Sequence, residues 1–365
     1  MIRLQQVLYL TLLFTLSTLT GCFQGVVSNS DTTPEMIAIS PEFEPPAAAP
    51  PPEAAAALSL DTSFAASAHP LSIASLRTRS YEGSDFIIEQ TLEPGVNYSR
   101  YIASYLSDGL KIYALLTVPL SPKPPTGYPV VIFNHGYIPP SEYRTTERYV
   151  AYVDAFARSD YIVVRPDYRG HGSSEGEPES AYGSPAYVID VLNALAAARR
   201  FPDADPQRVG MWGHSMGGYI TLRAMVAQQD VRAGVIWAGV VASYPEMFQS
   251  WFRGGSGSRR NWLSEAVEQF GTVESNPGFW NALSANSYLS DLSGPIQIHH
   301  GLADATVPAA YSIMLDEQIR AVGGTAELFL YPNDDHNIAA NRDGALALSV
   351  VFFDRYVKDL HGLSN

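Results

Sequence analysis

Two patterns of apolar and polar positions follow one another along the chain. Residues 84–91, 99–107 and 110–120 are predicted to form antiparallel strands, because they are short apolar runs separated by turn signals such as Ser107-Asp108-Gly109. After Pro129, apolar runs at 129–136, 161–170, 208–215 and 231–239 alternate with helix-like stretches at 148–160, 186–200 and 217–228. This alternation predicts an α/β fold, with a mostly parallel central sheet flanked by helices.

The first 75 residues differ in composition from the rest. Residues 1–22 combine a basic start at Arg3 with an apolar stretch too short to span a membrane, and they end in Leu-Thr-Gly-Cys. This ending resembles the lipobox of bacterial lipoproteins, in which Cys22 is lipidated. Residues 23–75 are rich in Pro, Ala and acidic residues, so we expect a disordered tether. The remaining residues, 76–365, are expected to form one folded domain.

A lipid anchor places the protein in a bacterial cell envelope. Phe23 follows Cys22 in place of an acidic residue, so retention at an inner membrane is not signalled and an outer-membrane or periplasm-facing location is favoured. The alternative is a signal peptide with an incidental cysteine. Because Cys22 is the only cysteine, no disulfide can form within one chain.

Composition excludes one class of partner. The chain has 365 residues, 46% of them hydrophobic, which is enough for one large core or two modest ones. A formal net charge of -14 argues against a nucleic-acid surface, which needs clustered Lys and Arg. We therefore expect no nucleic-acid partner. Separately from the charge, we expect a small-molecule substrate and contact with a membrane only through the lipid anchor. The sequence does not indicate the oligomeric state.

Functional residues of a parallel sheet gather in the loops after the strands. These loops begin at Asn134, Asp167, Gly213, Gly239, Gly301 and Asn333. "GHSMGG" at 213–218 puts Ser215 on a tight turn from strand to helix, where Met216 N–H faces a developing oxyanion. The backbone N–H of Tyr137, in "NHGY" at 134–137, is the second candidate oxyanion donor. Alternatively, Gly136 only closes a turn on which Tyr137 packs.

Two later loops supply an acid and a base for this serine. Asp304 follows one predicted strand, and His336 follows the last strand, just before the final helix. Asp334 and Asp335 are rival acids, but neighbours so close in sequence rarely reach the Nδ1 atom of the histidine. The order serine, aspartate, histidine is that of α/β-hydrolases, and it makes Ser215 the candidate nucleophile.

Residues 128–360 resemble the catalytic domain of the prolyl oligopeptidase family, within the α/β-hydrolase superfamily. The resemblance rests on "GHSMGGYITL", "HHGLADATVP" and "YPNDDHN", in this order. It implies a serine hydrolase in which Ser215 is the nucleophile, His336 the general base and Asp304 its orienting acid. Two features depart from the peptidases: Met216 stands where they usually have an aromatic residue, and the strands before Pro129 are too few for a β-propeller.

Other polar residues have both a structural and a functional interpretation. Arg169 and His171 either contact substrate or brace a turn, and the brace is favoured. His299 and His300 are adjacent in a strand and point to opposite faces, so we expect no metal there and no other cofactor. His214 is expected to support the loop beside the nucleophile.

Residues 242–289 interrupt the alternation of strand and helix and are expected to form a cap over the catalytic edge. Their aromatic side chains either attach the cap or line an acyl pocket; they are Tyr244, Phe248, Trp251, Phe252, Trp262, Phe270, Phe279, Trp280 and Tyr288. Arg253, Arg259 and Arg260 form a solvated basic loop or attract an acidic substrate.

The cap shows no acidic pair that could hold a substrate amine, since Glu246, Glu265, Glu268 and Glu274 are scattered. This favours a carboxylesterase-like activity on short or medium acyl esters. The alternatives are a serine peptidase without a propeller and a non-catalytic binding lipoprotein. The non-catalytic alternative is disfavoured because nucleophile, acid and base are all present.

Overall fold

The computed structural model describes residues 69–250 and 258–359. The predicted lipobox, the tether up to residue 68 and the segment with Trp251, Phe252 and Arg253 lie outside the described residues, as do the side chains of Arg259 and Arg260. Among the residues described, no helix has both the length and the apolar character that a membrane span requires.

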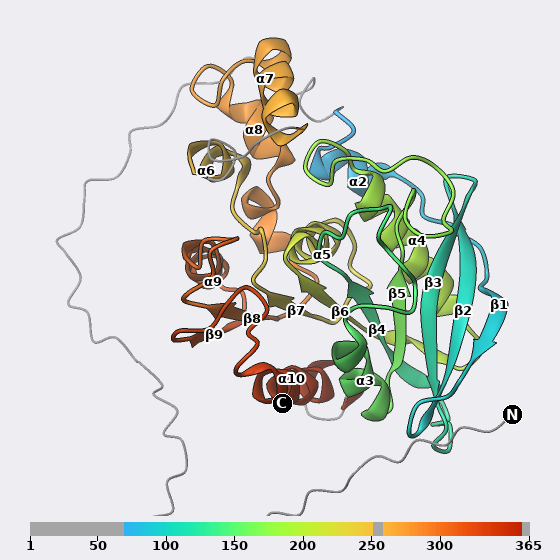
Figure 1. Cartoon of the computed structure of the whole chain (residues 1–365). Coiled ribbons are helices and arrows are strands. Elements are labelled where there is room, and N and C mark those ends of the chain that lie inside the picture. Colours follow the sequence, from blue (N-terminus) through green and yellow to red (C-terminus); the bar gives the residue numbers. More distant parts are fainter. Residues whose placement is uncertain (1–68, 251–257, 360–365) are drawn as a thin grey trace, which may run out of the picture. The chain divides into compact units, whose positions relative to one another are not determined.

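Nine strands of the described chain form one sheet in the spatial order β1-β2-β3-β5-β4-β6-β7-β8-β9 (Figure 1). They are β1 (Ile87–Leu92), β2 (Tyr98–Ser107), β3 (Leu110–Pro119), β4 (Tyr128–Asn134), β5 (Ile162–Pro166), β6 (Ala204–His214), β7 (Ala233–Trp237), β8 (Ile296–Gly301) and β9 (Ala326–Tyr331). Pairing is antiparallel from β1 to β5 through β2 and β3, and parallel from β5 to β9. The predicted α/β fold with a mostly parallel sheet is confirmed.

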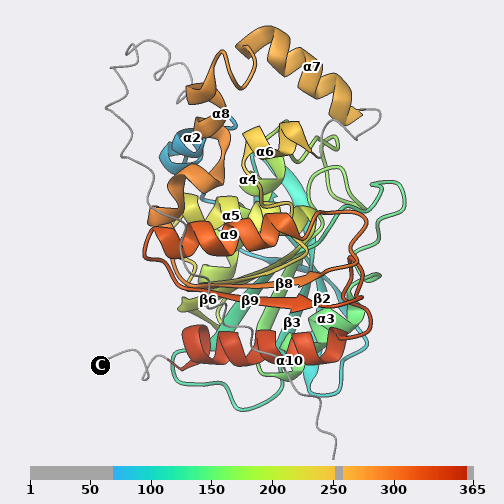
Figure 2. The ribbon, with the colours of Figure 1, turned by 90° about the vertical axis from the view of Figure 1, so that its left-hand side faces the viewer.

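Helices cover both faces of this sheet (Figure 2). On one face lie α3 (Val150–Arg158), α10 (Arg342–Phe353) and the π-helical turn η2 (Asp354–Lys358), which share an apolar core with Trp212. On the other face lie α2 (Ile73–Thr78), α4 (Ala186–Arg200), α5 (Met216–Ala227) and α9 (Ala310–Ala321). Every residue of β4 and β7 is buried, and both strands are nearly continuous apolar runs, as strands buried on both faces of a parallel sheet require.

The folded part includes residues that we expected in the tether. Ser72 caps α2, its hydroxyl accepting a hydrogen bond from the N–H of Ser75 at 3.0 Å. Leu71 and Ile73 are buried, and the buried guanidinium of Arg223 donates to the carbonyl of Leu71. The boundary at residue 76 is therefore wrong for residues 71–75, whose order comes from contacts with a helix distant in sequence.

An insertion between β7 and β8 consists of α6 (Tyr244–Gln249), α7 (Ser258–Phe270), α8 (Pro277–Leu283) and the 3-10 helix η1 (Ala285–Asp291). Its later helices lie over the helix layer: η1 packs on α5 and α9, and α8 packs on α2 (Figure 2). Buried Trp280, Leu283 and Leu289 join the apolar core of that layer. These later helices thus cover the helix layer, and the expected cap over the catalytic edge stays a prediction.

Aromatic side chains of the insertion pack on one another. The rings of Tyr244 and Phe248 lie 6.2 and 4.5 Å from that of Trp280, and Phe270 stacks on Phe279 at 4.3 Å. The Tyr244 hydroxyl donates to the carbonyl of Tyr182 at 2.6 Å. The ring contacts thus hold the helices of the insertion together, and the hydrogen bond to Tyr182 attaches the insertion to the body of the domain.

Candidate active site

Ser215 occupies a strained turn between β6 and α5. Its backbone angles are φ 56° and ψ -118°, a conformation that residues other than glycine rarely adopt. Hydrogen bonds hold this conformation: the N–H of Ser215 donates to Trp237 at 2.9 Å, and its carbonyl accepts from Gly218 at 3.0 Å and Val240 at 3.2 Å. A strained turn from strand to helix is the geometry that exposes a nucleophilic serine.

Glycines allow a second segment to approach this turn. A Cβ atom on Gly217 would lie 1.9 Å from the carbonyl oxygen of Asn134, so no side chain fits there. The segment after β4 therefore lies against the start of α5. A Cβ atom on Gly136 would lie 3.2 Å from the Cβ atom of Ser215. This places the segment that carries Tyr137 directly beside Ser215.

The two candidate oxyanion donors lie on segments that flank Ser215. Met216 is the first residue of α5, so its N–H has no acceptor within the helix. Tyr137 directly follows Gly136, and its side chain is 68% exposed. The backbone N–H groups of Met216 and Tyr137 stay the predicted donors.

Asp304 and His336 are brought together from separate loops. The Nδ1 atom of His336 lies 2.7 Å from Oδ2 of Asp304, and Oδ1 of Asp304 accepts from the N–H groups of Thr306 and Val307 at 2.7 and 3.0 Å. Burial alone would raise the pKa of Asp304, but hydrogen bonds from His300, His336 and Val307 hold the pKa below its usual range. The ionised carboxylate thus keeps the proton of His336 on Nδ1 and leaves Nε2 as the basic atom.

The rival acids have other partners. Asp334 accepts hydrogen bonds from the N–H groups of Ala340 and Asn341 at 3.1 and 3.0 Å. Asp335 accepts from the N–H of Asn337 at 2.9 Å. Both carboxylates therefore shape the loop that carries His336, and the direct contact favours Asp304 as the acid.

His300 is a contributor that the sequence analysis considered only as a metal ligand. Its Nε2 atom lies 3.1 Å from Oδ2 of Asp304 and 3.1 Å from the carbonyl of Val307, and its Nδ1 atom lies 2.6 Å from Oγ of Ser312. Carboxylate and carbonyl oxygens only accept, so Nε2 carries a proton and donates. His300 thus helps to hold the acid, a role that no spacing in the sequence signals.

The neighbouring His299 has different partners. Its Nδ1 atom lies 2.7 Å from Oη of Tyr331, and its Nε2 atom lies 2.7 Å from Oε1 of Gln297. The two adjacent histidines therefore do not share a site. In the described ranges, no group of three or more His, Cys, Asp or Glu residues is arranged to hold a metal ion.

His214 supports the nucleophile turn, as predicted. Its Nε2 atom lies 2.9 Å from the carbonyl of His336, and the two imidazole rings are 4.7 Å apart. Burial lowers the pKa of His214 to about 3, so the ring is neutral at physiological pH. The loop that carries the candidate base is thus attached to the residue directly before Ser215.

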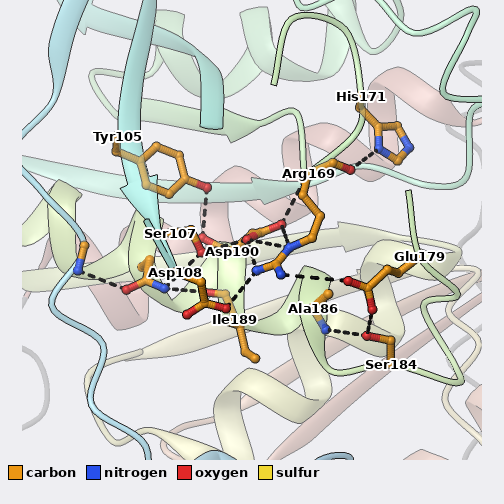
Figure 3. A network of polar contacts seen from close by, with 12 residues as sticks. Tyr105, Ser107, Asp108, Arg169, His171, Glu179, Ser184, Ala186, Ile189 and Asp190 are labelled. Carbon is orange, nitrogen blue, oxygen red and sulfur yellow. Dashed lines mark hydrogen bonds and ion pairs between the residues drawn. The ribbon is translucent and has the colours of Figure 1, made fainter. Parts of the chain in front are cut away.

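Arg169 braces the loop after β5. Figure 3 shows its guanidinium between Asp190 of α4 and Asp108 of the turn between β2 and β3. Its Nη2 atom lies 2.7 Å from Oδ1 of Asp190 and 3.1 Å from Oδ2 of Asp108. Glu179 adds a weaker contact at 3.9 Å. His171 is buried, and its Nδ1 atom lies 3.1 Å from the carbonyl of Arg169. The favoured interpretation of this motif as a braced turn is confirmed.

The strand order, the strained serine turn and the pair of aspartate and histidine define an α/β-hydrolase. Residues 148–360 match the prolyl oligopeptidase family, and the chain belongs to this family of serine hydrolases. It is 22% identical over 250 residues to the uncharacterized peptidase YtmA of Bacillus subtilis, covering 67% of this chain and 88% of YtmA. It is 28% identical to human dipeptidyl peptidase 8 over 65% of this chain, but that match spans only 26% of the human protein.

Solved structures with a similar fold include both esterases and peptidases. Acetyl xylan esterase 1 from Thermoanaerobacterium aligns with a TM-score of 0.59 at 17% identity, over 80% of this chain and 92% of the esterase. The acylaminoacyl peptidase of Pyrococcus horikoshii aligns with a TM-score of 0.59 at 20% identity, over 74% of this chain and 43% of the peptidase. The chain therefore spans less than half of the peptidase and nearly all of the esterase.

Proposed function

We propose that this protein is a carboxylesterase that acts through an acyl-enzyme on Ser215. Oγ of Ser215 attacks the ester carbonyl while Nε2 of His336 takes its proton, and the tetrahedral intermediate then expels the alcohol, which receives that proton. Water attacks the acyl-enzyme by the same route and restores the Ser215 hydroxyl. The observation that carries this proposal is the 2.7 Å contact between His336 and Asp304 beside the strained Ser215 turn.

The backbone N–H groups of Met216 and Tyr137 are proposed to bind the oxyanion. Both belong to segments that other contacts fix, so they need little rearrangement when charge develops on the substrate oxygen. One such donor contributes roughly 2.7 to 4 kcal/mol to stabilisation of the transition state.

Two observations support an ester in preference to a peptide. An exopeptidase needs a fixed acidic group for the substrate amine, whereas the glutamates of the insertion are scattered along it. The chain also covers 92% of an acetyl xylan esterase but 43% of an acylaminoacyl peptidase. The insertion would then contribute to an acyl pocket.

The second candidate is a serine peptidase without a propeller. Family membership favours it, as does the match to 88% of YtmA, a protein named as a peptidase. A third candidate, a binding lipoprotein without activity, is disfavoured because Ser215, Asp304 and His336 are all present.

We also propose that Cys22 is lipidated, so that the tether holds the enzyme in the cell envelope, facing the periplasm or the outer membrane. The support is the sequence Leu-Thr-Gly-Cys after a short apolar stretch.

Rates on p-nitrophenyl esters of increasing acyl length, measured beside rates on aminoacyl and prolyl anilides, test the choice of bond. The Ser215→Ala variant gives the background rate. We expect kcat/KM to be highest for a short or medium acyl ester. An anilide with a higher kcat/KM than every ester would establish the peptidase instead.

A further inference from the structure

A continuous set of hydrogen bonds connects the two sides of the candidate active site. The N–H of Gly136 donates to Oη of Tyr149 at 3.0 Å, and this oxygen lies 2.7 Å from Nδ1 of His214. The Nε2 atom of His214 in turn lies 2.9 Å from the carbonyl of His336. The path thus begins next to the proposed oxyanion donor Tyr137 and ends on the backbone of the proposed base.

The proton positions along this path follow from the chemistry of its groups. A carbonyl only accepts, so Nε2 of His214 carries a proton and donates to His336. Because burial keeps His214 neutral, its Nδ1 atom has no proton and accepts from Tyr149. Burial also raises the pKa of Tyr149, so the phenol keeps the proton that it donates. All the hydrogen bonds therefore run in one direction, from Gly136 to His336.

Tyr149 is held in an unusual backbone conformation. Its φ of 50° follows a φ of 55° at Arg148, and each such residue costs roughly 1 to 3 kcal/mol. The surroundings offset this cost: Arg165 of β5 donates to the carbonyl of Arg148 at 2.7 Å. The Tyr149 ring packs edge-on against Phe133 at 5.5 Å. The hydroxyl therefore has a fixed place before any substrate binds.

The segment that carries Gly136 and Tyr137 fits closely around the Tyr149 hydroxyl. A Cβ atom on Gly136 would lie 2.7 Å from Oη of Tyr149, 3.1 Å from Nδ1 of His214 and 3.2 Å from Cβ of Ser215. A displacement of the phenol would therefore move the segment that carries Tyr137 relative to Ser215.

We propose that Tyr149 is a positioning residue. Through His214, it aligns the segment that carries Tyr137 with the loop that carries His336. It does so without contacting substrate. The inference rests on the proposed function, in which Tyr137 and His336 act on the same reacting centre. Misalignment of these groups weakens transition-state stabilisation more than substrate binding, so the effect belongs in kcat and not in KM.

The Tyr149→Phe variant removes the hydroxyl and keeps the ring. We expect kcat on a p-nitrophenyl ester to fall roughly tenfold or more, the scale of losses at residues that support a catalytic group, while KM changes less than about twofold. Tyr161→Phe is the matched control. Tyr161 belongs to the same apolar core that Tyr149 packs against, and its hydroxyl donates to Oδ1 of Asp354 at 2.8 Å, so the loss of this hydroxyl should lower the melting temperature without changing kcat.

A double-mutant cycle tests whether the effect passes through His214. The His214→Gln variant can keep an N–H donor for the His336 carbonyl and removes the ring Nδ1 atom that accepts from Tyr149. In that background, Tyr149→Phe should lower kcat by a clearly smaller factor than in the wild type. Losses that multiply independently would show that the two residues act separately, and would overturn the proposal.

Histidine 15N NMR gives a readout that does not depend on turnover. The wild type should show His214 as the neutral tautomer with the proton on Nε2, and Tyr149→Phe should shift its Nδ1 signal while Tyr161→Phe leaves it unchanged. If the wild type hydrolyses esters and Tyr149→Phe matches Tyr161→Phe in kcat and in this signal, the positioning role of Tyr149 is refuted and the proposed function stands. If the wild type hydrolyses neither esters nor anilides, the proposed function fails, and the NMR signal still decides whether the hydrogen-bonded path exists.

Discussion

His336 Nδ1 lies 2.7 Å from Oδ2 of Asp304, although the two residues are 32 positions apart in the sequence. The carboxylate is completely buried, and the same oxygen also receives a hydrogen bond from His300 at 3.1 Å. The imidazole of His300 and the N–H groups of Thr306 and Val307 hold the Asp304 carboxylate in place. The carboxylate can therefore orient His336 without moving during the reaction.

Replacement of this acid should leave a folded but nearly inactive enzyme. Asp304→Asn removes the charge that selects the tautomer of His336, so we expect kcat to fall roughly 10³- to 10⁴-fold. Asp334→Asn is the control, because the Asp334 carboxylate accepts hydrogen bonds from the N–H groups of Ala340 and Asn341 in its own loop. A smaller loss in Asp304→Asn than in Asp334→Asn, measured by steady-state ester hydrolysis, would transfer the role to Asp334.

The proposed oxyanion donor on Tyr137 can be tested at the backbone. Tyr137→Pro removes the N–H and should lower kcat roughly 10²- to 10³-fold, whereas Tyr137→Phe keeps the N–H and should stay within about twofold of the wild type. Circular dichroism checks that both variants fold. An equal loss in both variants would assign the role to the phenol instead of the backbone.

The buried carboxyl of Asp167 gives a prediction about stability and pH. Burial raises its pKa to about 6, although hydrogen bonds from Thr145 and Tyr143 act in the opposite direction. Between pH 3.8 and about pH 6, this carboxyl is mostly ionised in the unfolded chain but still mostly protonated in the folded protein. The contribution of Asp167 to the free energy of unfolding therefore falls by about 3 kcal/mol as the pH rises through this window.

Urea unfolding of the wild type and of Asp167→Asn at pH 4 and pH 7 measures this effect. The variant lacks the titration, so its free energy of unfolding relative to the wild type should rise between the two pH values. Asp203→Asn, which changes a half-exposed carboxylate paired with Lys123, is the control. Parallel profiles for wild type and Asp167→Asn would contradict the raised pKa.

The lipid anchor is tested by one substitution. Cys22→Ser removes the only thiol that can be acylated, so the protein should leave the membrane fraction and keep the kcat of the wild type. Membrane fractionation and metabolic labelling with a fatty acid measure this. Membrane association that persists in the variant would refute the lipoprotein prediction.

Local patterns were sufficient to predict the parallel part of the fold and the loops of the site. Buried strands such as β4 and β7 are nearly continuous apolar runs, and the turn into α5 has the sequence Gly-His-Ser-Met-Gly-Gly, whose glycines are needed for close backbone approach. The contact between Asp304 and His336 could be predicted because the two residues follow the successive strands β8 and β9.

Contacts between segments far apart in the chain could not be predicted from the sequence. Tyr149 and His214 are 65 positions apart, so only the fold brings them together. His300 is four positions from Asp304, but this spacing does not indicate that the intervening loop turns the carboxylate back onto the imidazole. Residues 71–75 directly follow the tether and carry no strand or helix pattern long enough to identify, yet Leu71 is buried and its carbonyl accepts from Arg223, 152 positions away. The later helices of the insertion are apolar on the side that meets α5 and α9, but their sequence does not say which surface they cover.

Covalent labelling with a fluorophosphonate tests the central claim most directly, because the reagent needs an activated serine and no particular substrate. Intact mass and peptide mapping of the labelled protein should show one adduct, on Ser215, which is absent in Ser215→Ala and forms much more slowly in His336→Ala. Absence of an adduct on the folded wild type, or an adduct on another residue, would contradict the assignment of Ser215 as the nucleophile.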